Sequence, residues 1–492
     1  MLQFPLTKIM KPRSFVSCSR ASLWPSEFQV YLALNSLVQT SAGPDNIPYW
    51  ILKLGAPYLA EPISHIYRLS LTHSVVPHQW LLARVAPVAK QTKPTLPEHF
   101  RPISVTCILK RLFECLIVRR YIYPMLTDTS SCLFNDMQDQ FAFRPTGSTT
   151  ACIVAILKKI TELLSYEPFV RLVALDFSKA FDTLRTSALF AKLANLPLDD
   201  LVYNWLLKFY TNRQHYTAFN GQVSTPLSIN ASVIQGSVPG PTSYSINASD
   251  LHPERKENSL FKYADDGFLV VPASADDSVD LEIDHISEWA TKNNLRLNTG
   301  KSVDIIFTKK GCPSVLPQPH PNLRRVSEIK ILGVYFTEKL EMSTHISTVE
   351  SKCAQTLYAL KLLRANGLSG QNLHVVCRSL LETRLSYACP SWAGFTTVEE
   401  RGRLQKILNR AKRWGLNGGK DLPQFSKIVE EADASLFLKI CRDEAHVLHS
   451  LLPDETSHTH NVRPRPHRFK LSCETTLQRK NFLSRMTFKN VY

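Results

Sequence analysis

The chain of 492 residues carries 58 Lys and Arg against 42 Asp and Glu, which gives a formal net charge of +16. At roughly 150 residues per domain, this length predicts about three compact units and excludes a small scaffold held by disulfides. Hydrophobic residues at 44% and charged residues at 20% exclude wholesale disorder and a collagen-like repeat. The positive excess favours a polyanionic partner, either nucleic acid or an anionic membrane surface.

Cysteine usage and hydropathy bear on the compartment. The eleven cysteines are scattered and never arranged as Cys-x-x-Cys, which favours a reducing compartment and buried thiols. No apolar run is long enough to span a bilayer, and the basic N-terminus lacks a following apolar core. We therefore expect a soluble, intracellular protein with no membrane partner.

The first part of the chain is mostly helical by pattern. Ser26 is a good N-cap for a helix over Ser26–Leu37. Helical spacing continues to about Leu71, broken by Pro57 and Pro62. Short strand-like pieces with proline turns begin at Arg84 and precede another helical run.

Strand and helix patterns alternate from Val170 to Phe336, which is typical of a mixed α+β unit. The expected helices in this region cover residues 179–193, 201–210 and 277–293. After Thr337 the pattern is almost wholly helical. Within it, Arg401–Lys420 holds seven Lys or Arg and no acid.

Two acidic sites about ninety residues apart each end an apolar, strand-like run. Asp176 follows Leu172–Leu175, and Asp265 and Asp266 lie between two such runs, where Asp-Gly is a hairpin signal. Taken alone, each site is equally well a turn or a helix cap. Together, three carboxylates from neighbouring strands supply the oxygen ligands that Mg²⁺ prefers. Two such ions can hold the attacking and leaving oxygens of a phosphoryl transfer.

Several motifs occur together in one order along the chain. They read LDFSKAFDTL, IQGSVPGP, KYADD, LRLNTGKS and ILGVYF, after SAGPDNIPYWILK, PVAKQTKP, FRPISV and QFAFRPTGSTT. In this order the chain resembles the reverse transcriptases of non-LTR (LINE-like) retrotransposons from about Ser41 to Trp414. The specificity lies in the ordered co-occurrence of the motifs.

The resemblance implies a right-hand polymerase of α+β class, with fingers, a palm containing an antiparallel sheet, and a helical thumb. We expect an N-terminal helical extension over 1–40, fingers and palm over 41–336, a thumb and connection over 337–420, and a basic C-terminal remnant over 421–492. Because only about forty residues precede the fingers, we expect an element truncated of its endonuclease domain and incapable of autonomous transposition.

The resemblance assigns the metal ligands that the residue pattern already indicates. Asp176 and Asp265 are expected to bind two Mg²⁺ ions, which Mn²⁺ can replace, with Asp266 as the more peripheral ligand. Lys301 matches a lysine that protonates the leaving pyrophosphate, although a solvated surface lysine is an equal interpretation. Asp182 lies in a helix-like run and is expected to point away from the metals.

Five further positions match nucleotide-binding residues of the family. Arg101 is expected to contact the triphosphate and the base, with Lys90 beside it. Phe181 matches the aromatic ring that excludes a 2′-hydroxyl, and Gln235 and Gly236 match the pair that lets the backbone approach the nucleotide. The alternatives are a core Phe and an ordinary Gln-Gly turn.

The remaining matches concern nucleic acid. Tyr263 and the ILGVYF segment are expected to line the primer terminus, or else to be core strands. A phosphate-tracking face is expected from Arg401, Arg403, Lys406, Arg410, Lys412 and Arg413, with a solvated helix face as the alternative.

The resulting prediction is an RNA-directed DNA polymerase that extends a primer 3′-hydroxyl with dNTPs by two-metal phosphoryl transfer. Its partners would be an RNA template, a DNA primer, their heteroduplex and dNTPs, with nuclear residence only by analogy. One alternative is a catalytically silent, decayed or domesticated fragment that binds nucleic acid. Another is a maturase-like protein that chaperones intron RNA.

Overall fold

The computed structural model describes residues 12–13, 24–178, 180–229, 231–309, 316–455, 467, 469–471 and 475–489. Helices and sheets are mixed along the chain, so the α+β prediction is confirmed. Among the described residues, no helix combines the length and apolarity needed to cross a membrane.

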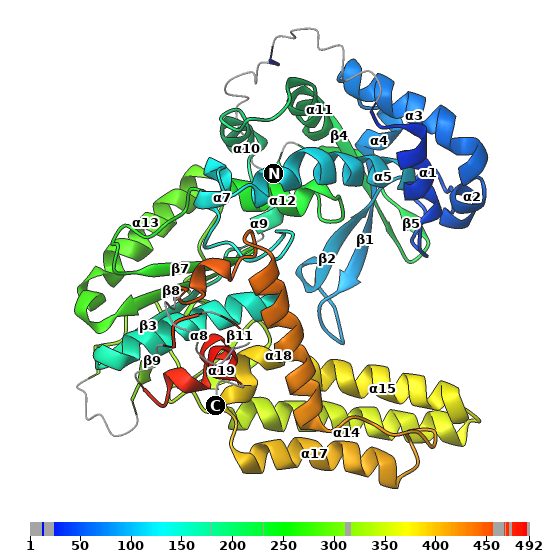
Figure 1. The fold of residues 1–492 in the computed structure, drawn as a ribbon. Helices are drawn as coiled ribbons and strands as arrows, with labels where there is room; N and C mark the ends of the chain where they lie inside the picture. The colour runs from blue at the N-terminus through cyan, green and yellow to red at the C-terminus, as the bar shows by residue number, and fades with distance from the viewer. Residues whose placement is uncertain are drawn as a thin grey trace, which may run out of the picture.

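The chain begins with a helical group at the top of Figure 1. Its helices are α1 (Glu27–Asn35), α2 (Tyr49–Leu54), α3 (Ala56–Thr72) and α4 (His78–Leu81). The predicted Ser26 cap is confirmed, because Ser26 and Gln29 form a capping box at the start of α1.

Helix α3 differs from the expectation of helices broken by proline. Pro57 lies in the first turn, where its missing N–H is not needed. Pro62 lies inside the helix without ending it. Burial of the apolar face offsets the lost hydrogen bond, since the Tyr67 ring stacks on Phe113 with ring centres 4.4 Å apart.

A first sheet adjoins these helices and has the strand order β2-β1-β4-β5, with β6 also paired to β4. Its strands are β1 (Leu82–Ala89), β2 (Phe100–Val105), β4 (Arg213–Phe219), β5 (Gln222–Val223) and β6 (Leu227–Ile229). The 3-10 helix η2 (Pro97–His99) precedes β2. Strands β1 and β2 form a hairpin that projects from the helical group (Figure 1).

A second group of helices follows this hairpin. It comprises α5 (Ile108–Ile117), the π-helix η3 (Val118–Ile122), α6 (Tyr123–Thr127), α7 (Cys132–Asp136) and the long α8 (Thr149–Tyr166). Helix α8 is apolar on most of its faces, because it is buried against the central sheet.

The central sheet has the strand order β10-β9-β3-β8-β7. Its strands are β3 (Phe169–Leu175), β7 (Ser259–Tyr263), β8 (Asp266–Pro272), β9 (Val303–Thr308) and β10 (Arg324–Arg325). Strand β3 is antiparallel to both β8 and β9. Its alternate residues enter different cores, with Val173 and Leu175 in one and Val170 and Leu172 in the other.

The helices between the strands of the central sheet pack mainly into the first core. They are α9 (Ala180–Thr183), α10 (Thr186–Leu193), α11 (Asp200–Tyr210), α12 (Pro239–Asn247), the 3-10 helix η4 (Ala273–Ser278) and α13 (Val279–Lys292). The single helix expected over 179–193 is in fact two. The carbonyls of Phe181 and Leu184 accept hydrogen bonds from the backbone of Val233 and Ser232, instead of continuing one helix.

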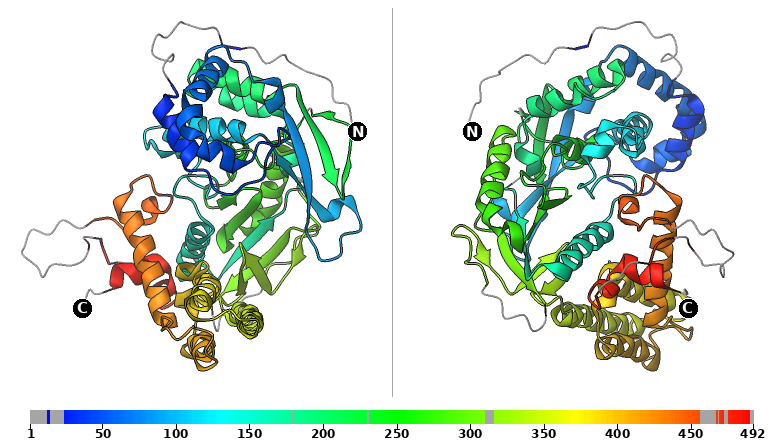
Figure 2. Two further views of the ribbon diagram at one scale, coloured as in Figure 1. Left: turned by 90° about the vertical axis from the view of Figure 1, so that its right-hand side faces the viewer. Right: turned by 60° about the vertical axis from the view of Figure 1, so that its left-hand side comes forward.

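The last part of the chain packs into the second core. It begins with a hairpin of β11 (Glu328–Ile331) and β12 (Val334–Thr337). The helices that follow are α14 (Ser343–Ala365), α15 (Gly370–Ser386), α16 (Cys389–Trp392), η5 (Ala393–Phe395), α17 (Val398–Arg413), α18 (Phe425–Arg442), η6 (His449–Leu451), η7 (Gln478–Lys480) and α19 (Phe482–Phe488). Helices α14, α15 and α17 lie at the bottom of Figure 1, and Figure 2 shows them from two other sides.

Candidate active site

The first predicted carboxylate stands at the end of a buried strand. Asp176 directly follows β3, and Leu175 at the end of β3 is paired with Gly267 of β8. The Asp176 backbone is fixed on both sides, since its N–H donates to Ser302 Oγ over 3.1 Å and its carbonyl accepts from Asn298 over 2.7 Å. The strand register therefore sets Asp176 beside the start of β8.

The other two carboxylates lie at the β7–β8 turn. Tyr263 pairs with Asp266, so Ala264 and Asp265 form a two-residue turn. This corrects the expected Asp-Gly hairpin turn, because Asp266 and Gly267 are already in β8. Gly267 serves the packing instead, since a Cβ on it would lie 3.2 Å from Leu175 Cδ1.

Gln140, which sequence reasoning missed, braces this turn. Its buried side-chain oxygen accepts hydrogen bonds from the backbone N–H of Ala142 at 3.0 Å and of Ala264 at 3.3 Å. Ala264 has a φ of +58°, an unfavourable conformation for a residue with a Cβ. The QFAFR motif contained the signal, but nothing in it indicated contact with a turn more than a hundred residues away.

The electrostatics of the three carboxylates indicate that they lie close together. Burial raises the pKa of Asp265, and the charge of Asp176 raises it further. Burial, Asp265 and Asp176 together raise the pKa of Asp266 to about 6. Arg101 of β2 acts in the opposite direction on the Asp265 pKa. The guanidinium predicted to contact the triphosphate is therefore within electrostatic reach of the acids.

The donor set matches a hard divalent cation in its chemistry. Three carboxylates that repel one another are the ligands that Mg²⁺ prefers, and a cation would relieve their repulsion. Within the described ranges, however, no three His, Cys, Asp or Glu side chains are grouped closely enough to hold a metal ion. The three side chains would have to draw together around an ion.

A cavity of about 360 Å³ opens beside these acids. Asp176, Asp266 and Lys301 line it, together with residues of β11 and β12. The backbone N–H of Lys301 donates to Asn298, which also holds Asp176. The fold thus brings Lys301 and the ILGVYF segment to the same cavity as two of the acids.

Phe181 lies in an aromatic pair next to the acidic turn. Its ring stacks on Tyr244 of α12 with ring centres 4.7 Å apart. Burial raises the pKa of Tyr244 above its ordinary value, and the charges of Asp265 and Asp266 raise it further. Tyr244 therefore connects Phe181 with the acids, which the sequence pattern did not indicate.

Gln235 and Gly236 form a tightly held loop. The Gln235 carbonyl accepts from Ser104 N–H over 2.7 Å, and its Nε2 donates to Asp182 Oδ1 over 3.1 Å. Gly236 has a φ of +120°, and a Cβ on it would lie 2.3 Å from the Ser104 carbonyl oxygen. Only glycine fits this approach. Asp182 thus orients Gln235, consistent with the expectation that it does not point to the metals.

Two other predicted residues, Lys90 and Tyr263, make contacts within the protein. Lys90 is exposed in the loop between β1 and β2, where its Nζ donates to the carbonyl of Glu98 over 3.1 Å. Tyr263 is half-buried and packs against the second core. Burial raises the Tyr263 pKa, as does nearby Tyr387, whose hydroxyl donates to the Leu332 carbonyl at the β11–β12 turn.

The predicted basic residues all lie on α17, but they are not equivalent. Arg403 pairs with Glu350, and Lys412 pairs with Asp421 over 2.8 Å. Arg410 lies over the Trp414 ring, and Arg403, Lys406 and Arg410 line a cavity of about 290 Å³. Although the run itself contains no acid, acids elsewhere in the chain neutralise part of its positive charge.

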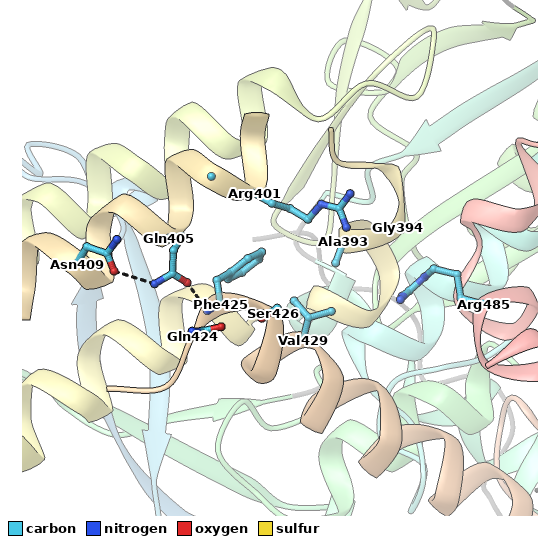
Figure 3. A pocket seen from close by; sticks show the side chains of 11 residues that line it. Ala393, Gly394, Arg401, Gln405, Asn409, Gln424, Phe425, Ser426, Val429 and Arg485 are labelled. Atoms are coloured by element: carbon cyan, nitrogen blue, oxygen red, sulfur yellow. Dashed lines mark hydrogen bonds between the residues drawn. The ribbon is translucent and has the colours of Figure 1, made fainter. Parts of the chain in front are cut away.

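Arg401 lies apart from these residues, in a cavity of about 600 Å³ between α17 and the start of α18 (Figure 3). Gln405 and Asn409 follow Arg401 along one side of α17, and Gln405 Oε1 accepts from the Phe425 N–H over 2.8 Å. None of the predicted catalytic or nucleotide-binding residues lines this cavity.

The three acids, the Gln235–Gly236 loop and the β3–β8 register all lie within one segment that matches a known protein family. Residues 88–336, slightly more than half of the chain, match the reverse transcriptase (RNA-dependent DNA polymerase) family. The chain belongs to this family. The matched segment contains Arg101, Asp176, Asp265 and Asp266, and it ends with β12.

Similar reverse transcriptases are encoded by fly transposons. A probable RNA-directed DNA polymerase from transposon BS of Drosophila melanogaster is 26% identical and covers 78% of this chain and 44% of its own length. A probable RNA-directed DNA polymerase from transposon X-element of the same fly is 27% identical, over 68% of this chain and 38% of its own length. The predicted resemblance to non-LTR retrotransposon reverse transcriptases is confirmed. The chain spans less than half the length of these relatives.

Solved structures give a weaker match. A telomerase from Candida tropicalis, in complex with a fragment of telomeric RNA, aligns with a TM-score of 0.41 and 14% identity. The alignment covers 76% of this chain and 64% of the telomerase chain.

Proposed function

We propose that this chain is an RNA-directed DNA polymerase that extends a primer 3′-hydroxyl with dNTPs on an RNA template. The observation that carries the proposal is the convergence of Asp176, Asp265 and Asp266 at one edge of the central sheet. Burial raises the pKa values of Asp265 and Asp266, and the charges of the neighbouring acids raise them further. Such an arrangement is costly unless cations bind it, so it favours a site that holds divalent ions.

Asp176 and Asp265 would hold two Mg²⁺ ions, with Asp266 at the periphery. Bound Mg²⁺ would supply charge stabilisation for the primer oxygen and the leaving pyrophosphate. Arg101, exposed on β2 and within the field of Asp265, would bind the triphosphate. Lys301, in the cavity shared with Asp176 and Asp266, would donate a proton from Nζ to the departing pyrophosphate.

The substrate class follows from the Gln235–Gly236 loop and from Phe181. Gly236 would expose backbone to the nucleotide, and Gln235, held by Asp182, would contact the base pair formed with the template. Phe181, supported by Tyr244, would lie under the sugar and exclude a 2′-hydroxyl. Basic side chains of α17 that pair with no acid among the described residues, such as Lys406, would follow the phosphates of the RNA–DNA heteroduplex.

The proposal is tested by Asp265→Asn in a primer-extension assay. This change should lower extension at least about 1,000-fold, because it removes a carboxylate that would ligate metal. Heteroduplex affinity should change less than threefold. Asp284→Asn, an exposed acid on the outer side of α13, is the matched control and should extend primers like the unaltered chain. Residual extension by Asp265→Asn above a tenth of normal would contradict the assignment.

A further inference from the structure

A group of buried charges lies directly behind the Gln235–Gly236 loop. Lys110 and Glu114 of α5 are both 0% exposed, and Arg213 at the start of β4 is 3% exposed. Lys110 Nζ and Glu114 Oε1 are 3.7 Å apart, and Lys110 also lies over the Phe209 ring. Lys110 and Glu114 are one turn apart on α5. Arg213 joins them only through the fold, so no sequence motif indicated the cluster.

The cluster is incompletely paired within itself. Lys110 Nζ, Glu114 Oε1, Arg213 Nε and Arg213 Nη2 have no hydrogen-bond partner among the described residues. Burial of such groups costs free energy that an apolar cluster of the same size would not. The contact with Lys110 alone therefore does not account for a carboxylate at position 114.

The second oxygen of Glu114 makes a different contact. Glu114 Oε2 accepts a hydrogen bond from the backbone N–H of Val238 over 2.8 Å. Val238 is the residue before α12, and it lies two positions after Gly236. Its N–H has no helical partner there, so the carboxylate satisfies an otherwise unpaired, partly buried donor.

Glu114 thus completes a set of restraints on this loop. Ser104 holds the Gln235 carbonyl, Asp182 holds the Gln235 side chain, and Glu114 holds the loop where it enters α12. Ser104 lies on β2, the strand that carries Arg101, and Glu114 lies on α5, the next helix along the chain. The position of the loop is therefore coupled to the segment that carries the predicted triphosphate ligand.

We propose that Glu114 is a positioning residue for the incoming nucleotide, which it serves by fixing the Gln235–Val238 loop through its hydrogen bond to Val238. This inference rests on the proposed polymerase function. Glu114 does not touch the nucleotide. It limits the movement of backbone that must lie close to the nucleotide, so its loss should weaken dNTP binding more than it slows the chemical step.

Two substitutions separate the hydrogen bond from the charge. Glu114→Gln removes the charge but keeps an oxygen at the same reach. Glu114→Asp keeps the charge but withdraws the oxygen by one methylene group. We expect Glu114→Asp to raise the KM for dNTP at least tenfold with kcat within threefold, and Glu114→Gln to stay within threefold of normal in both.

A matched control comes from a second buried glutamate. Glu282 is also 0% exposed and accepts from the backbone N–H groups of Glu254 and Arg255, on a loop outside the predicted nucleotide site. Glu282→Asp should lower thermal stability to a similar extent without changing the KM for dNTP. The proposal would be overturned if Glu282→Asp raised the KM for dNTP as much as Glu114→Asp does. It would also be overturned if Glu114→Gln raised that KM to the same extent.

A readout without turnover keeps this test separate from that of the proposed function. Hydrogen exchange of the full chain is followed in the peptide that contains residues 236–238. Exchange there should accelerate at least tenfold in Glu114→Asp and stay unchanged in Glu114→Gln and Glu282→Asp. Unchanged exchange in Glu114→Asp overturns the inference even if the polymerase is active. If Glu114→Asp does not fold, the test uses Glu114→Gln alone. A tenfold rise in either its exchange rate at residues 236–238 or its KM for dNTP would contradict the proposal.

Discussion

At the scale of single residues, the site depends on atoms that lie near one another for reasons invisible in the local sequence. Asp176 and Asp265 are about ninety positions apart, yet the β3–β8 register brings their strand ends together. Their residue types and strand-like surroundings led to their prediction as metal ligands, which stays a prediction. Gln140, Tyr244 and Glu114 were missed, because each acts through a tertiary contact that no periodicity encodes.

Phe181 gives a prediction at this scale. Phe181→Val should raise the incorporation of ribonucleotides relative to deoxynucleotides at least about tenfold, equivalent to about 1.4 kcal/mol of lost discrimination. The physical reason is removal of the ring that stacks on Tyr244 beside the acids. The measurement is single-nucleotide insertion with matched rNTP and dNTP.

The control for this substitution is Phe190→Val. Phe190 is a buried core residue of α10, so its loss creates a cavity without altering the predicted sugar position. An unchanged ratio in Phe181→Val, or the same change in Phe190→Val, would show that Phe181 is only part of the core.

At the scale of elements, predictions from pattern were accurate where one signal dominated and inaccurate where packing competed. The Ser26 cap of α1 and the strand-like run of β3 are local and were predicted. The Asp-Gly signal was misplaced by two positions, because close packing of Gly267 on Leu175 sets the β8 register. The helix expected over 179–193 is divided because the backbone N–H groups of Ser232 and Val233 donate hydrogen bonds to carbonyls that a continuous helix would use.

Helix α14 gives a prediction about pH. Burial, with Lys352 nearby, lowers the pKa of His345 to about 4, and the ring packs against Trp392. An unfolded histidine titrates near about 6.5, so the unfolded chain takes up the proton first as pH falls. The stability provided by the neutral ring is complete above about pH 6.5 and is lost as pH falls towards 4.

His345→Phe should therefore flatten the pH dependence of unfolding. Between pH 4 and 6.5, the slope of unfolding free energy against pH should decrease by up to about 1.4 kcal/mol per pH unit. Denaturant titrations across this range measure it, with His65→Phe at an exposed position of α3 as the control. A slope unaltered by His345→Phe would show that the buried ring does not resist protonation.

At the scale of the whole molecule, two cores meet at the central sheet, and the basic helix α17 belongs to the second. The net charge of +16 predicted a polyanionic partner, but it could not identify which charges are free. In the structure the basic residues of α17 fall into two groups. Arg403 and Lys412 are paired with acids, whereas no acid pairs with Lys406 or Arg413 among the described residues.

This division predicts the salt dependence of heteroduplex binding. Lys406→Gln with Arg413→Gln should reduce the slope of log affinity against log salt concentration by about 2, since each phosphate contact contributes about 0.9. Arg403→Gln with Lys412→Gln removes the same charge from residues already paired with acids, and should change the slope by less than half as much. Equal effects of the two pairs would contradict a specific role for the free residues.

The central claim, that the three acids perform polymerase chemistry, is tested most directly by primer extension on poly(rA) with oligo(dT), dTTP and Mg²⁺. The unaltered chain is compared with the Asp265→Asn, Asp266→Asn double variant at equal heteroduplex occupancy. We predict extension by the unaltered chain and none by the double variant. Absence of extension by a folded chain whose heteroduplex binding is weakened by salt would contradict the claim, and would identify a nucleic-acid-binding protein without turnover.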